Sequence, residues 1–241
     1  MYLIVGTTER TKRFGSEPGH FPLCSSAKAT AHSELFVNTR PLLLASSSPY
    51  RKALLERLRL PFTCASPDID ETALPSESAE TLTLRLAEQK ARALANEYPR
   101  HLIIGSDQVA LLPSGQILTK PGHYDAAFQQ LQASSGKAVT FLTGLAVLDA
   151  ESGKVRRTCE PFKVHFRPLS ATDIEHYLLT EEPYDCAGSF KMEGLGINLF
   201  SRFEGRDPNS LIGLPLIALI ELLHALDVDP LAMAYRNSTR D

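Results

Sequence analysis

The sequence predicts an α/β domain preceded by an N-terminal extension. Its 241 residues suffice for one sizeable domain, or two small ones, without disulfide or metal staples. Strand-like and helical patterns alternate from Pro41 onward, as in α/β folds. Residues 6–40 mix small, polar and charged residues with no period of 2 or 3.6. We expect a disordered extension over 1–40, a folded domain over 41–228 and a C-terminal tail over 229–241.

The elements are expected in the following order. Strands are predicted where apolar runs occur, at 42–45, 62–65, 102–112, 138–148 and 155–166. Helices are predicted where apolar residues recur at helical spacing, at 50–60, 79–98, 124–133, 171–179 and 215–226. The turn Ala150–Gly153 joins the last two strands as a hairpin. The sheet is therefore expected to be mixed, and the glycine-rich stretch 188–213 to be irregular.

Composition and charge narrow the class of protein. A net charge of -3 argues against binding to duplex nucleic acid, which requires a concentrated basic face. The cysteines are far apart and form no C-x-x-C pair, so we expect a reducing compartment and neither a zinc knuckle nor a disulfide framework. No apolar run approaches the roughly 18 to 20 residues that span a bilayer. A cytoplasmic protein without membrane partners is expected, and a homodimer is left open.

The extension over residues 1–40 has two other interpretations. It can be an organelle-targeting segment, or the start codon can have been assigned too far upstream. The acidic residues Glu9, Glu17 and Glu34 count against targeting.

The first candidate site is the segment that links the first predicted strand to the first predicted helix. Ser48 is suited to cap this helix and Pro49 to occupy its first position, which leaves backbone N–H groups facing outward. Arg51 lies in the first turn, where acidic residues are preferred. A bound phosphate would offset its charge. The alternative is a plain serine cap with a solvated arginine.

Lys90 and Asp107 are charged residues in apolar surroundings. Lys90 falls on the apolar stripe of the helix 80–98, formed by Leu82, Leu86, Ala93 and Leu94. Its ammonium either reaches water along the helix or faces phosphate oxygens in a cleft. Asp107 interrupts the apolar run 102–112, so we expect it to be paired, metal-bound or raised in pKa. A strand-end aspartate satisfied by backbone N–H groups is the alternative.

Other motifs are weaker on their own. The loop with Asp68, Asp70 and Glu71 offers oxygen ligands for a hard cation, although such clusters are usually solvated. Lys120 is a surface lysine by default. The glycines of 188–196 permit close approach of the backbone to a ligand, and 205–215 has turn chemistry that favours a structural role.

Taken together, several motifs resemble the Maf family of nucleoside triphosphate pyrophosphatases. The resemblance covers residues 42 to about 224. The motifs that carry it are Leu-Ala-Ser-x-Ser-Pro-x-Arg51, Asp70-Glu71, Glu88-Gln-Lys90-Ala, Gly-Ser-Asp107-Gln108, Lys120-Pro121 and Asn209-Ser-x-x-Gly-Leu-Pro215. It implies a Maf/ITPase-like fold, with a mixed sheet flanked by helices and two lobes around a nucleotide-binding cleft. It also implies hydrolysis at the α–β linkage of a nucleotide substrate with a divalent metal, Mg or Mn.

The resemblance also implies a role for individual residues. Asp107 would accept the proton, and Glu71 would help to bind the metal. The triphosphate would be held by Ser46, Arg51, Lys90 and Lys120.

Within the family, Tyr50, Gln108 and Glu193 resemble the branch that acts on 7-methyl-GTP. The branch that acts on dTTP and UTP has arginine, threonine and glutamine at these positions. N7-methylation makes guanine cationic, so stacking on Tyr50 and a carboxylate from Glu193 would both favour it. Tyr50 departs from the tryptophan that is frequent in the branch, and a smaller ring should stack less strongly. The alternatives are a dTTP/UTP pyrophosphatase and a nucleotide-binding regulator without turnover.

Overall fold

A computed structural model describes residues 40–239 of the chain. Apart from Arg40, the extension expected over residues 1–40 lies outside the described residues, as do residues 240 and 241.

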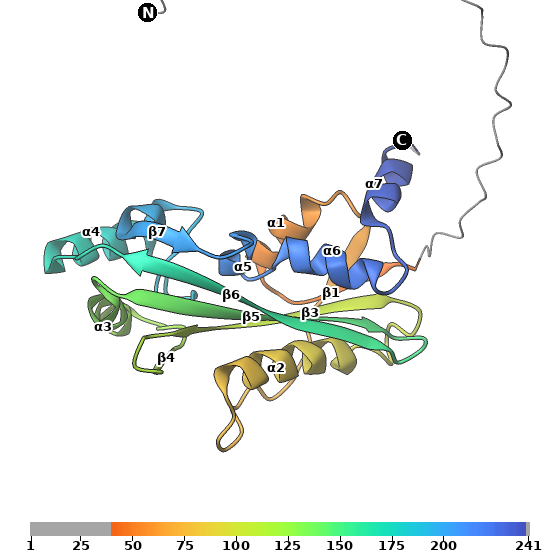
Figure 1. Cartoon of the computed structure of the whole chain (residues 1–241), viewed down its shortest axis with the longest axis horizontal. Coiled ribbons are helices and arrows are strands. Elements are labelled where there is room, and N and C mark those ends of the chain that lie inside the picture. The colour runs from red at the N-terminus through yellow and green to blue at the C-terminus, as the bar shows by residue number, and fades with distance from the viewer. Residues whose placement is uncertain (1–39, 240–241) are drawn as a thin grey trace, which may run out of the picture. The chain divides into compact units, whose positions relative to one another are not determined.

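One seven-stranded sheet forms the centre of the described part (Figure 1). Its order is β2-β1-β3-β5-β6-β7, and the short β4 pairs with β3. β1 runs parallel to β2 and β3, whereas the other pairings are antiparallel. The expected mixed sheet and its hairpin are therefore confirmed. The strands are β1 Leu42–Ala45, β2 Phe62–Ala65, β3 Leu102–Leu111, β4 Ile117–Leu118, β5 Ala138–Asp149, β6 Val155–Phe166 and β7 Phe200–Glu204.

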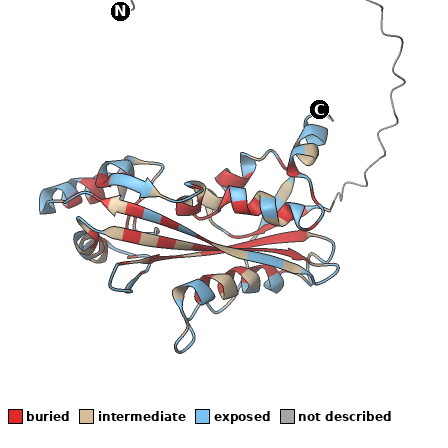
Figure 2. Ribbon diagram, viewed as in Figure 1, coloured by how far each residue is buried: buried red, intermediate tan, exposed pale blue. Residues whose placement is uncertain are grey.

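Helices cover both faces of this sheet at the end that contains β1. Alternate residues of a strand point to opposite faces. Leu42 and Leu44 pack in a core with α1 and α6, while Leu43 and Ala45 pack with α2 on the other side. Figure 2 shows the resulting buried residues along the strands and on the sheet-facing sides of the helices. These helices are α1 Pro49–Glu56, α2 Ala79–Ala93 and α6 Leu216–His224.

A second core lies at the opposite end of β5 and β6. There Phe141 and Phe166 pack with α3 Tyr124–Ser134 and α4 Ala171–Glu181. The ring of Phe190 contacts both phenylalanines, with centroids 5.4 and 5.8 Å away. The domain thus has two cores at the two ends of its long strands, which corresponds to the expected two lobes.

The structure differs from the sequence prediction mainly at element ends and in the glycine-rich stretch. α2 ends at Ala93 instead of continuing to Tyr98, and Ala93 is exposed, not part of the buried stripe. The stretch expected to be irregular contains η1 Leu195–Leu199, β7 and α5 Asn209–Ile212. These elements are short and lie between glycines, so neither helical nor strand periodicity can develop. The expected C-terminal tail contains a helix, α7 Pro230–Ser238.

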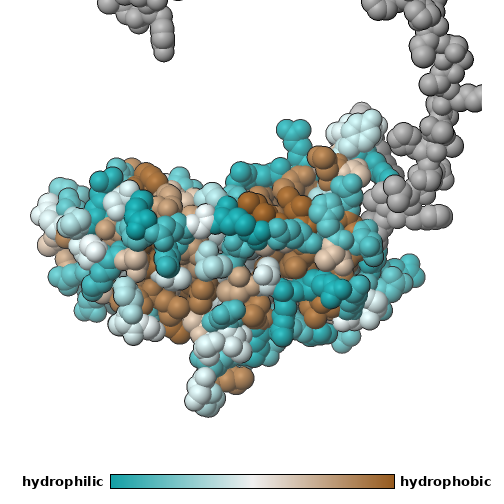
Figure 3. Space-filling model, viewed as in Figure 1, coloured by the Kyte–Doolittle hydropathy of each residue, from teal (hydrophilic) through white to brown (hydrophobic). Residues whose placement is uncertain are grey.

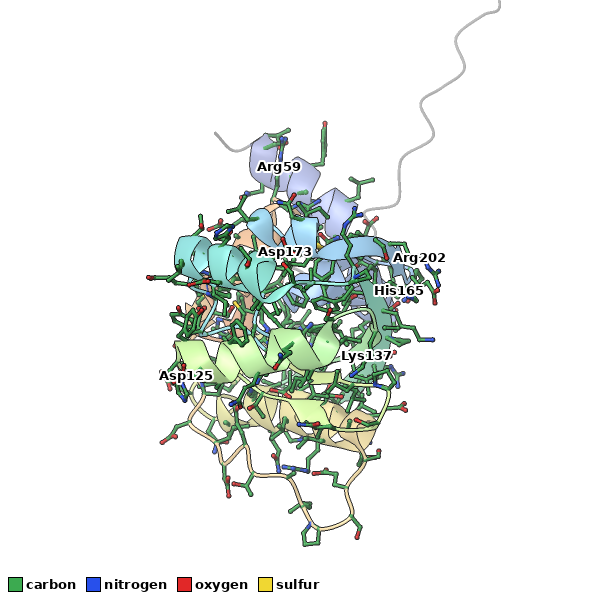
Figure 4. All side chains as sticks on the ribbon, turned by 90° about the vertical axis from the view of Figure 1, so that its left-hand side faces the viewer. Arg59, Asp125, Lys137, His165, Asp173 and Arg202 are labelled. Carbon is green, nitrogen blue, oxygen red and sulfur yellow. The ribbon has the colours of Figure 1, made fainter. Side chains whose placement is uncertain are left out.

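β7 is held to β6 by cross-strand pairing and by charge. His165 lies opposite Arg202 in the register, and Figure 4 shows the two at one edge of the domain. Both side chains contact Glu204, with His165 Nε2 3.0 Å from Oε1. Ion pairs exposed at a sheet edge add little stability. The position of β7 is therefore stabilised mainly by the packing of Phe200 against Phe166 and Phe190.

None of the helices within residues 40–239 is long and apolar enough to cross a membrane. On the face drawn in Figure 3, apolar side chains over α6 are mixed with hydrophilic ones.

Candidate functional site

A cleft of about 790 Å³ is lined by residues from both cores. Phe141 and Phe190 belong to the core beside α3 and α4, and Ala45 and Leu86 come from the side of α2. All nine of the site residues expected from the sequence line this cleft. They are Ser46, Tyr50, Arg51, Glu71, Lys90, Asp107, Gln108, Lys120 and Glu193.

One corner of the cleft is built from Ser46 and Arg51, where β1 passes into α1. Ser46 Oγ accepts from Ser48 N at 3.1 Å and from Arg51 Nη1 at 3.5 Å, so its own O–H is still available as a donor. Arg51 Nε donates to the carbonyl of Gly213 at 2.9 Å. This anchor leaves the outer edge of the guanidinium, with three of its five N–H donors, for an acceptor in the cleft.

The first turn of α1 adds backbone donors to the same corner. Ser48 caps the helix by accepting from Arg51 N at 3.4 Å, and Pro49 at the first position has no N–H. The N–H groups of Ser47 and Tyr50 have no acceptor among residues 40–239. Free N–H groups at the start of a helix attract anions, and no acidic residue occupies this turn.

Lys90 joins two carboxylates deeper in the cleft. Its Nζ lies 2.7 Å from Asp107 Oδ1 and 2.8 Å from Glu71 Oε1. The side chains of Lys90 and Asp107 are 9% and 10% exposed, whereas that of Glu71 is 59% exposed. The expectation that Asp107 is paired is thereby confirmed, and the buried lysine does not simply reach toward water. An ammonium has three donors, so one is left for a third acceptor.

The charges around Glu71 and Arg51 shift their pKa values. Partial burial acts to raise the pKa of Glu71, but the hydrogen bond and charge of Lys90, with help from Lys120, lower it overall. Burial lowers the pKa of Arg51, although Asp107 and Glu71 oppose the shift. The carboxylate of Glu71 is therefore ionised. It lies near the positive charges of Lys90, Lys120 and Arg51, which can also bind a polyanionic ligand.

The cleft also contains an aromatic ring among acidic groups. Tyr50 lines the cleft together with Asp185, Cys186 and Glu193, and it interacts electrostatically with all three. Burial raises the pKa of the Tyr50 phenol to about 12, and the Asp185 and Glu193 carboxylates add to the shift. The phenol stays neutral at physiological pH, and its negative surroundings suit an electron-poor or cationic ring.

Gln108 lies at the cleft wall and also contacts the backbone of Ser210 and Leu211. Its Nε2 donates to Thr143 Oγ1 at 2.9 Å and to the carbonyl of Ser210 at 2.7 Å. Its Oε1 accepts no hydrogen bond from residues 40–239. Lys120 is exposed at the rim.

The family model described as Maf-like protein matches residues 41–226. The chain belongs to this family. The Maf domain is 62% identical, over 182 residues, to a 7-methyl-GTP pyrophosphatase of Pseudomonas savastanoi pv. phaseolicola, covering 76% of this chain and 94% of that protein. It is 60% identical, over 189 residues, to a 7-methyl-GTP pyrophosphatase of Pseudomonas fluorescens, covering 78% and 98%. The Ham1 protein of Staphylococcus aureus is a distant structural neighbour, 10% identical with a TM-score of 0.43, covering 83% of this chain and 99% of that chain.

The donor set of the Maf domain fits a divalent cation that is held partly by its substrate. Within residues 40–239 no group of three or more His, Cys, Asp or Glu side chains is arranged as a metal site. Asp107 and Glu71, however, both contact the same ammonium and so lie close together. Magnesium is commonly bound by one or two carboxylates and completed by substrate phosphates and water.

The segment 207–213 of the Maf domain, for which turn chemistry predicted a structural role, also positions residues of the site. The carbonyl of Gly213 accepts from both Arg51 Nε and Ser106 Oγ, each at 2.9 Å. The buried carboxylate of Asp207 accepts from Asn209 N at 2.9 Å and Ile217 N at 2.8 Å, which fixes this turn. Because the carbonyl of Gly213 makes the contact with Arg51, no residue type in the sequence signals that contact.

Proposed function

We propose that this protein hydrolyses 7-methyl-GTP to 7-methyl-GMP and pyrophosphate. One observation carries the proposal: a buried Asp107–Lys90 pair lies in the same cleft as an anion-binding corner and an aromatic ring flanked by carboxylates. The names of the Pseudomonas relatives support the same substrate. The spread of the cysteines supports a cytoplasmic location.

The triphosphate would lie along the cationic side of the cleft. Ser46 would donate its O–H, and Arg51 would donate from its outer edge to two phosphate oxygens. Lys90 would use its third donor, and Lys120 would reach from the rim. These groups would neutralise the charge that develops on the pyrophosphate leaving group.

Asp107 would act as the general base. Water attacks the α-phosphorus, the bond from that phosphorus to the bridging oxygen breaks, and Asp107 accepts the proton of the water. The Lys90 ammonium, 2.7 Å from Oδ1, orients the carboxylate and leaves Oδ2 to face the water.

Glu71 would help to hold a divalent cation, Mg or Mn, together with phosphate oxygens. When bound, this cation supplies Lewis-acid stabilisation of phosphate charge.

The methylated base would stack on Tyr50. Its positive charge is favoured by the π-face of the ring and by the carboxylates of Asp185 and Glu193. Glu193 would also accept from the guanine N1–H and exocyclic amine. Gln108 would offer its Oε1, which has no partner among residues 40–239.

Hydrolysis in ¹⁸O-labelled water tests the reaction proposed here. Attack at the α-phosphorus places the label in 7-methyl-GMP and leaves pyrophosphate unlabelled, which mass spectrometry distinguishes. Label in pyrophosphate, or release of orthophosphate from the γ-position, would contradict the proposal.

A further inference from the structure

Two glycines lie where helix α2 comes nearest to the sheet. We propose that Gly105 and Gly144 are positioning residues that seat α2 on the sheet and thereby hold Lys90 against Asp107. The inference rests on the proposed function, because it assigns the two glycines to the same site.

Both glycines flank Asp107 on the side that α2 covers. Gly105 precedes Asp107 by two residues on β3, so the two positions face the same side of the sheet. Gly144 lies on β5 directly opposite Asp107 in the antiparallel register. On the same side, Ile103 and Val109 pack against buried residues of α2.

The backbone of α2 fills the space that side chains at these two positions would need. A Cβ at Gly105 would lie 2.1 Å from the carbonyl oxygen of Ala87, and one at Gly144 would lie 2.2 Å from that of Thr83. Both obstructing atoms belong to the helix backbone, so a change of rotamer cannot relieve the clash. A side chain at either glycine must push α2 away from the sheet.

Lys90 depends on this close approach. Thr83, Ala87 and Lys90 follow at spacings of four and three residues along one face of α2, and all three are buried. The Lys90 Nζ to Asp107 Oδ1 distance is 2.7 Å. A displacement of α2 by about 1 Å takes this contact beyond the range of a hydrogen bond. The glycines therefore act on Asp107 through Lys90, without touching the substrate.

A double-mutant cycle separates this positioning role from a general effect on folding. Gly144→Ala and Lys90→Met are measured singly and together, with kcat/KM for 7-methyl-GTP as the readout. We expect Lys90→Met to lower kcat/KM about tenfold less in the Gly144→Ala background than in the wild type, as for residues that share a contact. An equal loss in both backgrounds would overturn the proposal.

Two control variants test whether the coupling is specific to Gly144 and Lys90. Lys120 lies at the rim and outside α2, so Lys120→Met and Gly144→Ala should have independent effects. Leu219→Ala makes a cavity on the other face of the sheet and should not change the effect of Lys90→Met. If Gly144→Ala does not fold, Ala91→Val takes its place. Ala91 is a fully buried residue of α2 that packs with Ile103 of the sheet, so a larger side chain there should also move α2 away from the sheet.

A second readout needs no turnover. Acylation of the Lys90 amine is followed by mass spectrometry and compared with acylation of the exposed Lys52 in the same sample. The ratio should rise several-fold in Gly144→Ala, because the ammonium leaves its two carboxylates. An unchanged ratio would contradict the positioning role. Failure of the wild type to cleave 7-methyl-GTP would contradict the proposed function alone, since the acylation ratio does not depend on substrate.

Discussion

At the scale of single residues, base recognition depends on Tyr50 and Glu193. Both line the cleft, and burial, with a further contribution from the Asp185 and Glu193 carboxylates, raises the pKa of Tyr50. A neutral guanine can stack on the same ring, but it gains less from the negative charge. The discrimination between 7-methyl-GTP and GTP should therefore reside in charge more than in shape.

Glu193→Gln tests whether charge discriminates 7-methyl-GTP from GTP. We expect kcat/KM for 7-methyl-GTP to fall roughly 10- to 100-fold, the effect of losing hydrogen bonds to a charged group. The loss for GTP should be smaller, because only the methylated base is cationic. Steady-state kinetics on both nucleotides measure the ratio, and equal losses would contradict a charge-based selection.

Tyr50→Trp provides the complementary variant. The larger ring should lower KM for 7-methyl-GTP, and Tyr50→Leu should raise it, because cation–π attraction is strongest for tryptophan.

The charged residues of the site were predictable because charge in an apolar pattern is visible in a sequence. Asp107 inside an apolar run indicated a partner, and the structure provides Lys90. Lys90 on a buried stripe was expected to reach water or phosphate oxygens, and its two carboxylate partners were not predicted. Gly144 carried no such signal, since its effect depends on a helix that is distant in the chain. The contacts of the Gln108 amide with the segment 210–211 were equally hidden, because their acceptors are backbone carbonyls.

At the scale of elements, the loop before α2 is tied to the helix by Glu77 and Arg85. Arg85 Nε and Nη2 donate to the two oxygens of Glu77 at 2.8 and 2.7 Å. The same loop carries Glu71 into the cleft. The hydrogen bonds from Arg85, together with that from Leu74 N, lower the pKa of Glu77 to about 2.

This depressed pKa predicts how stability depends on pH. Because the folded-state pKa is below the unfolded value, the contribution of Glu77 is complete above about pH 5 and declines as pH falls toward the folded-state pKa. Urea unfolding should therefore show a destabilised Glu77→Gln variant whose deficit shrinks between about pH 5 and pH 3. A deficit that stays constant over this range would contradict the assignment.

Glu56→Gln is the matched control for this experiment. Glu56 is 56% exposed and lies 3.8 Å from Lys52. Exposed pairs of this kind contribute little, so its removal should leave the unfolding free energy nearly unchanged.

Most of the elements were predictable because each has its own periodic pattern. β1, β2 and β6 begin and end at the expected residues. β7 could not be predicted in this way, because it is a short strand between glycines that is stabilised by distant rings. α2 ends at Ala93, and Leu94 is its C-cap. The spacing of apolar residues continues past this point and does not reveal where the helix ends.

At the scale of the whole molecule, the cleft exists because two cores form at opposite ends of one sheet. β5 and β6 run through both, and each core contributes residues to the cleft. The segment 207–213 joins the anion-binding corner to the wall that carries Gln108. Phosphate binding and base recognition are thus supported by one continuous scaffold.

Pyrophosphate release across a panel of nucleotides tests both the proposed reaction and its substrate. Pyrophosphate release is measured with purified protein and Mg²⁺ across 7-methyl-GTP, GTP, dTTP, UTP and CTP, with Asp107→Asn as the control. We expect kcat/KM for 7-methyl-GTP to exceed the others, and Asp107→Asn to lose at least about 100-fold in kcat while it still folds and binds nucleotide. A preference for dTTP or UTP, or undiminished turnover in Asp107→Asn, would contradict the account.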